Sequence, residues 1–193
     1  MDEKYPFRYL EAFESLDNAV RLLLFEKKLT VPGLMLLFCN IDIYAGWSRP
    51  AEKPDVTRSD FISWVESYLL PGSSLECSGR ELYGARCGLL HALSNESSLS
   101  RNDGVRELIF VNNAENLPAI KYMIRDAGRE LELKVVVVQQ LWEAFHRGTR
   151  EFLEKLENDP VKAKLFEARG GKRLISIIND EDVEYRNLLS KKS

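Results

Sequence analysis

Two residues whose types suit proton transfer and anion binding lie five positions apart, at Arg86 and His91. An imidazole exchanges protons near neutral pH, whereas a guanidinium keeps its charge and binds phosphate or carboxylate groups. Both lie in the segment ELYGARCGLLHAL, which we predict to be a helix because Ser78 and Glu81 form a capping box before it. This helix is expected to end near Leu93, and it carries the candidate site.

Arg86 falls within the apolar face of this predicted helix. At about 100° per residue, that face contains Leu82, Ala85, Leu89, Leu93 and, at its edge, Leu90. An unpaired charge in such a position is costly, so Arg86 requires a carboxylate partner. Asp42 lies inside the most apolar predicted helix, and we expect a bidentate Arg86–Asp42 pair between the two helices. Such a pair could serve a site or only fix the register of the helices.

Small residues lie on another side of the same helix. His91 shares that side with Gly84, Cys87 and Gly88, and Tyr83 borders it. Two glycines four residues apart would let another helix approach closely, so this face could be a dimer seam or one wall of a cleft. Cys87 and His91 also allow a nucleophile and a base, but a thiol in mid-helix lacks the surroundings that usually lower its pKa.

Three further helices must position this one. Apolar residues at helical spacing predict a helix from about 6 to 28, and Thr30 is expected to cap a second helix that ends at Gly46. A third helix is predicted to start near Thr57, after a surface loop with the sequence SRPAEKP. The polar stretch SNESSLSRNDG should then break the helical pattern. Because each helix carries an apolar stripe, residues 1–98 are predicted to form a helical bundle.

The chain changes character after Gly104. The runs ELIFV and KVVVV have strand length and flank a helical segment near PAIKYMIRDAG, so we expect two parallel strands joined by a crossover. RLISII, after the turn-forming pair Gly170-Gly171, could add a third strand. LWEAFHRGTREFLEKL is predicted to be a long amphipathic helix on which His146 is packed or exposed. The predicted fold is mainly α, with an α/β extension at 99–193 that packs on the same core and ends in a polar tail.

Composition excludes several function classes. The net charge of −3 and the pI of about 5.6 argue against an extended DNA-binding surface. The N-terminus lacks the pattern of a secretory signal, and the longest apolar stretch is too short to span a bilayer, so we expect a cytoplasmic protein without membrane association. Cys39, Cys77 and Cys87 show no metal-ligand spacing and are expected to be reduced thiols. No metal or cofactor is expected.

The arginine and histidine in this context resemble the motif of the HEPN family. ARCGLLHAL places Arg86, four residues and then His91 on the last helix of a predicted four-helix bundle. HEPN domains carry an arginine and a histidine at such a spacing on the corresponding helix. The likeness extends from about residue 6 to 94, and Cys87 stands where the family usually has a polar residue.

The resemblance implies a homodimer whose two motif helices meet and a nucleotide- or RNA-binding site that acts as a metal-independent ribonuclease. His91 would then be the general base or acid, Arg86 would stabilise charge on the scissile phosphate, Asp42 would orient Arg86, and Tyr83 would hold the nucleotide. The residues also allow a non-catalytic dimerisation or interaction module, regulatory or defence-associated, in which the Arg86–Asp42 pair is structural. The acidic balance of the chain favours this alternative.

Overall fold

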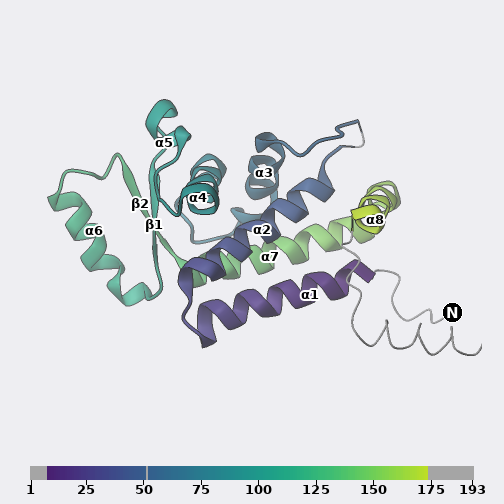
Figure 1. Cartoon of the computed structure of the whole chain (residues 1–193), viewed down its shortest axis with the longest axis horizontal. Coiled ribbons are helices and arrows are strands. Elements are labelled where there is room, and N and C mark those ends of the chain that lie inside the picture. The colour runs from purple at the N-terminus through teal and green to yellow at the C-terminus, as the bar shows by residue number, and fades with distance from the viewer. Residues whose placement is uncertain (1–7, 51, 174–193) are drawn as a thin grey trace, which may run out of the picture.

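Helices dominate the computed structural model, which describes residues 8–50 and 52–173 (Figure 1). The helices are α1 Arg8–Arg21, α2 Thr30–Ser48, α3 Arg58–Trp64, α4 Gly79–Ala92, α5 Ser98–Asp103, α6 Leu117–Asp126, α7 Val138–Glu157 and α8 Pro160–Arg173. Two strands, β1 Glu107–Val111 and β2 Leu133–Val137, complete the regular structure, and π-helical turns at Leu22–Glu26 and Val65–Leu69 extend α1 and α3. The predicted fold class, mainly α with a small α/β segment, is confirmed.

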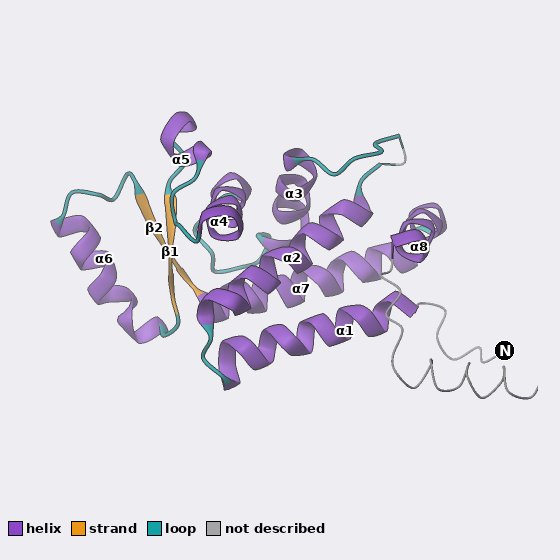
Figure 2. Ribbon diagram, in the orientation of Figure 1, coloured by secondary structure: helices purple, strands orange, loops and turns teal. Residues whose placement is uncertain are grey.

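The two strands form a small parallel sheet at one end of the molecule, with α6 beyond it (Figure 2). Glu107 lies opposite Leu133 and Val111 opposite Val137, so all five residues of each strand are paired. The predicted strand, helix and parallel strand are confirmed. Of the predicted third strand, RLISII, only Arg173 is described, as the last residue of α8, and the remainder lies outside the described residues.

The core is built from both halves of the chain. Tyr44 of α2 lies at its centre, stacked on Phe13 of α1 and on Trp64 of α3 with ring centroids 4.5 and 5.7 Å away. Phe145 and Phe152 of α7 meet the same ring edge-on. These rings meet because α1, α2 and α7 run alongside one another through the middle of the molecule (Figure 1). Burial of these aromatic rings therefore ties α7 to the N-terminal helices.

The start of α2 differs from the expectation that Thr30 caps it. Leu29 is the N-cap residue, and no side chain caps this helix. Thr30 Oγ1 instead donates to Asn112 Oδ1 at 2.9 Å, and Asn112 Nδ2 donates back to Thr30 Oγ1 at 2.8 Å. Thr30 thus joins the beginning of α2 to the residue after β1.

Two segments predicted to interrupt helices contain helices. The polar stretch after α4 includes α5, which begins with a capping box between Ser97 and Ser100. Gly170 and Gly171, expected to form a turn, lie inside α8. The loop between α2 and α3 lies at the surface as expected, since residues 50 and 52–57 are exposed. Arg49 alone is enclosed there, and its guanidinium donates to the carbonyls of Gly46, Lys53 and Pro54. Within the described ranges, every helix is too short or too polar to span a lipid bilayer.

Candidate functional site

Helix α4 positions both Arg86 and His91. Its predicted capping box is present, with Ser78 N donating to Glu81 Oε2 at 2.7 Å and Glu81 N donating to Ser78 Oγ at 3.2 Å. The helix ends at Ala92, and its C-cap residue, Leu93, adopts a left-handed conformation with φ of 50°. Leu93 is consequently 71% exposed instead of belonging to the apolar face as expected. His91 lies in the last helical turn and is also exposed.

Arg86 meets Asp42 of α2, as the sequence predicts. Arg86 Nε and Nη2 each lie 2.8 Å from Asp42 Oδ2, so both nitrogens bind one oxygen instead of the expected two. The pair is half-buried rather than enclosed, since the Arg86 and Asp42 side chains are 21% and 25% exposed. Two charge-assisted contacts hold the guanidinium in a fixed orientation.

Burial and pairing have opposite effects on these two charges. Burial raises the pKa of the Asp42 carboxyl, and the hydrogen bond and charge of Arg86 oppose that rise without cancelling it. For Arg86, burial works against the charge, yet the hydrogen bond and charge of Asp42 raise the guanidinium pKa above its ordinary value. The guanidinium stays charged, and Asp42 offsets the cost of holding that charge in this half-buried position.

The third nitrogen of the guanidinium faces His91. Arg86 Nη1 lies 3.2 Å from His91 Nε2. A guanidinium can only donate, so this contact is a hydrogen bond in the His91 tautomer that carries its proton on Nδ1 and a lone pair on Nε2. Tyr83 lies beside the same group, with the centre of its ring 5.9 Å from the guanidinium carbon. Arg86 thus links the carboxylate of α2, the imidazole at the end of α4 and an aromatic ring.

Cys87 belongs to this cluster but does not form the nucleophile and base pair that its spacing allows. Arg86 Nη1 lies 4.0 Å from Cys87 Sγ. Burial and a hydrogen bond with Cys87 raise the pKa of Tyr83. Among the described residues, the hydrogen bonds of the Cys87 side chain go to Arg86 and Tyr83, and none joins it to His91. Cys87 packs against the site without being activated by the imidazole.

An open groove lies beside the Arg86–Asp42 pair. We call it the Arg86 groove; it has a volume of about 390 Å³, and its lining includes Asp42, Trp47, Thr57, Arg58, Tyr83 and Arg86. This volume lies within the range of small-molecule sites. Two guanidinium groups and one carboxylate line it: Arg86 pairs with Asp42, and Arg58 lies 4.0 Å from Asp103, so the lining residues themselves carry one excess positive charge. An anion with a planar ring would find both cations and aromatic surfaces there.

The Gly84 and Gly88 face is not available for a second helix, contrary to expectation. A Cβ atom on Gly88 would lie 2.4 Å from the carbonyl oxygen of Ser94 and 2.8 Å from that of Glu96. A Cβ on Gly84 would lie 3.2 Å from Ser97 Oγ. Both glycines are buried by the chain that follows α4. The close approach that these small residues permit is made within one molecule, so they do not provide a dimer seam.

Comparison with protein-family models, with curated proteins and with solved structures finds no match for this chain. Arguments about its function therefore rest on the geometry described above. Among the described residues, no group of three or more histidine, cysteine or acidic side chains is placed to hold a metal ion.

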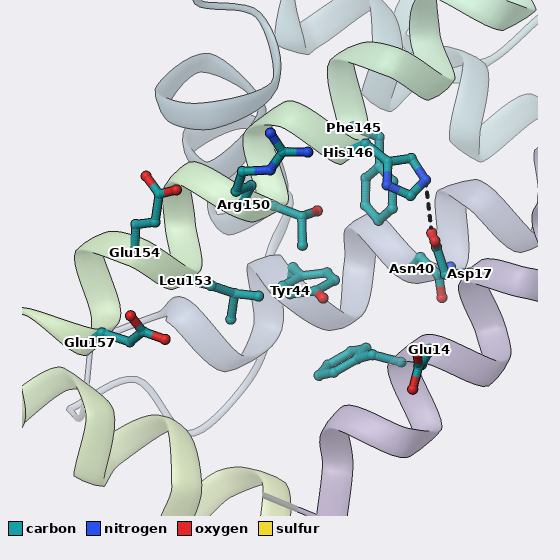
Figure 3. A pocket seen from close by; sticks show the side chains of 12 residues that line it. Glu14, Asp17, Asn40, Tyr44, Phe145, His146, Arg150, Leu153, Glu154 and Glu157 are labelled. Atoms are coloured by element: carbon teal, nitrogen blue, oxygen red, sulfur yellow. Dashed lines mark ion pairs between the residues drawn. The ribbon is translucent and has the colours of Figure 1, made fainter.

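A second polar cluster was missed by the sequence analysis. His146 of α7 has a partner, because its Nε2 atom lies 3.2 Å from Asp17 Oδ1 of α1 (Figure 3). Its ring also packs against Trp142, with centroids 3.9 Å apart. The two polar residues lie far apart in sequence, on helices whose contact no short motif reveals. An aspartate on the polar flank of an amphipathic helix gave no signal that a histidine would face it.

Proposed function

We propose that this chain is a HEPN-like protein that binds RNA or a nucleotide in the Arg86 groove and cleaves RNA without a metal ion. The observation that carries the proposal is the 3.2 Å contact between Nε2 of the exposed His91 and Nη1 of Arg86, which lines the Arg86 groove. A phosphate bound to Arg86 would therefore lie next to a proton-exchanging base.

In the proposed reaction, the RNA 2′-oxygen attacks the adjacent phosphorus and the bond from phosphorus to the 5′-oxygen breaks. The 2′-hydroxyl loses a proton and the leaving 5′-oxygen gains one, so the products are a 2′,3′-cyclic phosphate and a 5′-hydroxyl. Binding of the phosphate by Arg86 Nη1 would release His91 Nε2 from its contact with the guanidinium, and the lone pair of Nε2 would then take the first proton. A second proton donor is needed, and His91 of a second copy would supply it in the homodimer that the HEPN resemblance implies.

Arg86 and Asp42 have separable parts in this proposal. Arg86 would bind the phosphate through the nitrogen that faces His91, because its other two nitrogens are held by Asp42. Asp42 is a positioning residue, since it orients the guanidinium without touching the RNA. Tyr83 offers a ring for base stacking, and Arg58 offers a second cation for the RNA backbone. The exposed end of α4, with His91 and Leu93, is the surface through which two motif helices could meet.

The test is cleavage of a labelled single-stranded RNA containing all four bases, in buffer with EDTA. We expect the wild type to give products ending in a 2′,3′-cyclic phosphate. His91→Ala should lower the rate at least about 100-fold, the lower range for loss of a general acid or base, and Arg86→Ala should lower it similarly. Arg80→Ala is the matched control, because Arg80 lies on the same helix but is exposed outside the groove.

Equal cleavage by the wild type, Arg86→Ala and His91→Ala would refute the ribonuclease proposal. So would complete loss of activity in EDTA. Because His91 is exposed, His91→Ala should fold normally even if loss of Arg86 disturbs the pair with Asp42.

The alternative is a non-catalytic interaction module in which the Arg86–Asp42 pair only sets the register of α2 and α4. One observation favours it: Asp42 already binds two of the three guanidinium nitrogens. Absence of RNA cleavage and RNA binding by the wild type, together with a stable dimer, would support this alternative.

A further inference from the structure

The loop between α2 and α3 supplies one wall of the Arg86 groove. Val56, Thr57 and Arg58 line the groove where this loop leads into α3, and we call these three residues the loop wall. All three are exposed, and they offer the groove an apolar side chain, a hydroxyl and a cation. An exposed loop keeps one conformation only if other parts of the chain hold its backbone. The contacts that hold this loop therefore set the shape of the groove.

Arg49 holds the loop from inside. Its guanidinium donates to the carbonyl oxygens of Gly46, Lys53 and Pro54, with Nε 3.0 Å from Lys53 O and Nη2 2.8 Å from Pro54 O. Gly46 also lies against the loop wall, because a Cβ atom on it would be 3.0 Å from Val56 Cγ2. The loop thus folds back onto the last turn of α2.

Arg169 of α8 holds the start of the loop from outside. Its Nη1 atom donates to the carbonyl oxygens of Trp47, at 3.2 Å, and of Arg49, and its Nη2 atom donates to that of Pro50 at 2.6 Å. The last carbonyls of a helix have no partner within it, and a planar guanidinium can bridge several of them at once. A side chain from the far end of the described chain thus fixes the path by which the loop leaves α2.

Phe166, one helical turn before Arg169, anchors α8 at this place. Its ring meets that of Trp47 edge-on with centroids 5.1 Å apart, and Trp47 is itself a lining residue of the Arg86 groove. Phe166 also packs on Phe152 of α7, with centroids 5.6 Å apart, and it is buried. Figure 1 shows α8 beside the end of α2 that leads into the loop. Helix α8 is therefore fixed in the core while it contacts the frame of the groove.

We propose that Arg169 is a positioning residue for the Arg86 groove and holds the loop wall where it can bind RNA. This inference rests on the proposed function, because it concerns the affinity of the groove for its RNA substrate. Arg169 is not among the residues that line the groove, so it acts through the loop without touching the RNA. Arg86 and His91 belong to α4, so the chemical step does not depend on Arg169.

This role predicts a change in KM and not in kcat. Binding that is equally strong in the ground state and in the transition state lowers KM and leaves kcat unchanged. Loss of a correctly placed loop wall should therefore raise KM. A variant that only lowers the fraction of folded protein has the opposite signature, since it lowers the apparent kcat and leaves KM unchanged. One set of kinetic measurements separates the two causes.

The test compares the full-length wild type with Arg169→Met. KM and kcat are measured with the labelled single-stranded RNA, and Kd is measured with the same sequence as 2′-O-methyl RNA, which has no 2′-hydroxyl to attack. We expect KM and Kd to rise about tenfold and kcat to stay within about twofold of the wild type. Arg169→Lys should give intermediate values, because an ammonium group lacks the planar fork that bridges several carbonyls.

Arg147→Met is the matched control. Arg147 Nη2 donates to the carbonyl oxygen of Leu69 at 2.6 Å, so it also joins a guanidinium to a carbonyl at the end of a helical turn. Arg147 is not among the residues that line the Arg86 groove. Its loss should leave KM and Kd unchanged, and any loss of folded protein should appear in kcat alone.

Unchanged KM and Kd in both Arg169 variants would overturn this inference and leave the ribonuclease proposal intact. An equal rise in Arg147→Met would also overturn it, because that arginine does not reach the loop wall. If the wild type binds the 2′-O-methyl RNA but cleaves no RNA, the ribonuclease proposal fails and the Kd values still decide the role of Arg169. Absence of RNA binding by the wild type would overturn both.

Discussion

The Arg86–Asp42 pair allows a quantitative test of whether this contact is more than a surface ion pair. Two charges about 4 Å apart attract by about 4 kcal/mol at an effective dielectric constant of 20. Burial offsets part of this, since it raises the pKa of the Asp42 carboxyl despite the guanidinium. With two contacts of 2.8 Å between half-buried side chains, we expect a net coupling of about 2 kcal/mol, within the range of charge-assisted hydrogen bonds.

A double-mutant cycle measures this coupling. The variants are Arg86→Met, Asp42→Leu and the double variant, and the measured quantity is the free energy of unfolding in urea. Each single variant leaves a half-buried charge without its partner, so each should destabilise the chain by about 2–3 kcal/mol. The double variant leaves no orphan charge and should cost clearly less than the sum of the two. For a chain of this size, 1 kcal/mol corresponds to a shift of about 2–4 °C in Tm.

The Arg80–Asp103 pair supplies the matched control. It involves the same helix and the same types of charge, but its atoms are 3.5 Å apart and its side chains are 56% and 41% exposed. An exposed pair of this kind should couple by less than about 0.5 kcal/mol. If the Arg86–Asp42 coupling is no larger than the Arg80–Asp103 coupling, the guanidinium is not held in place by Asp42, and the positioning argument fails.

Two further predictions concern the residues that pack around the site. Gly88→Ala should lower the free energy of unfolding by about 3 kcal/mol, because the new Cβ would meet two backbone carbonyl oxygens. Gly84→Ala should lower it by less, because its Cβ would meet only Ser97 Oγ, at 3.2 Å. Equal and small effects of the two variants in urea unfolding would show that the chain after α4 does not pack on this helix. Asp60 tests pH dependence: burial opposes its charge, but its hydrogen bonds with Thr57 and Lys53 lower its pKa below the ordinary 3.8. The stabilisation by the charged Asp60 is therefore complete above the pKa of this carboxyl in the unfolded chain, and it is lost as the pH falls through its lower pKa in the folded chain. In urea unfolding, Asp60→Asn should lower the free energy of unfolding by about 1 kcal/mol at pH 7 and by progressively less below pH 4. A loss of stability that does not change with pH would contradict this.

Much of the candidate site could be predicted because charges inside apolar stripes need partners. Arg86 and Asp42 were each anomalous on their own helices, and one contact resolves both anomalies. The position of α4 followed from its capping box, a local pattern whose hydrogen bonds depend on residues three apart. These features are encoded in short segments, so they can be recognised without knowing the fold.

Other features depend on where the chain goes after a helix ends. Leu93 turns into the left-handed region, which exposes its side chain and directs the following residues back over Gly84 and Gly88. A helical projection treats Leu93 as one more apolar position and leaves the glycine face open. The His146–Asp17 contact was equally hidden, because it depends on the packing of α7 against α1. Such contacts depend on tertiary packing, which periodicity does not specify.

The placement of α7 has a consequence for biosynthesis. Phe145 and Phe152 complete the ring cluster around Tyr44, yet they are translated long after the helices that they cover. While they are still inside the ribosome, the face of the nascent N-terminal helices that α7 covers has no partner to bury it. The complete core therefore forms only after α7 has been translated, and until then this apolar face of the emerging polypeptide is exposed to aggregation.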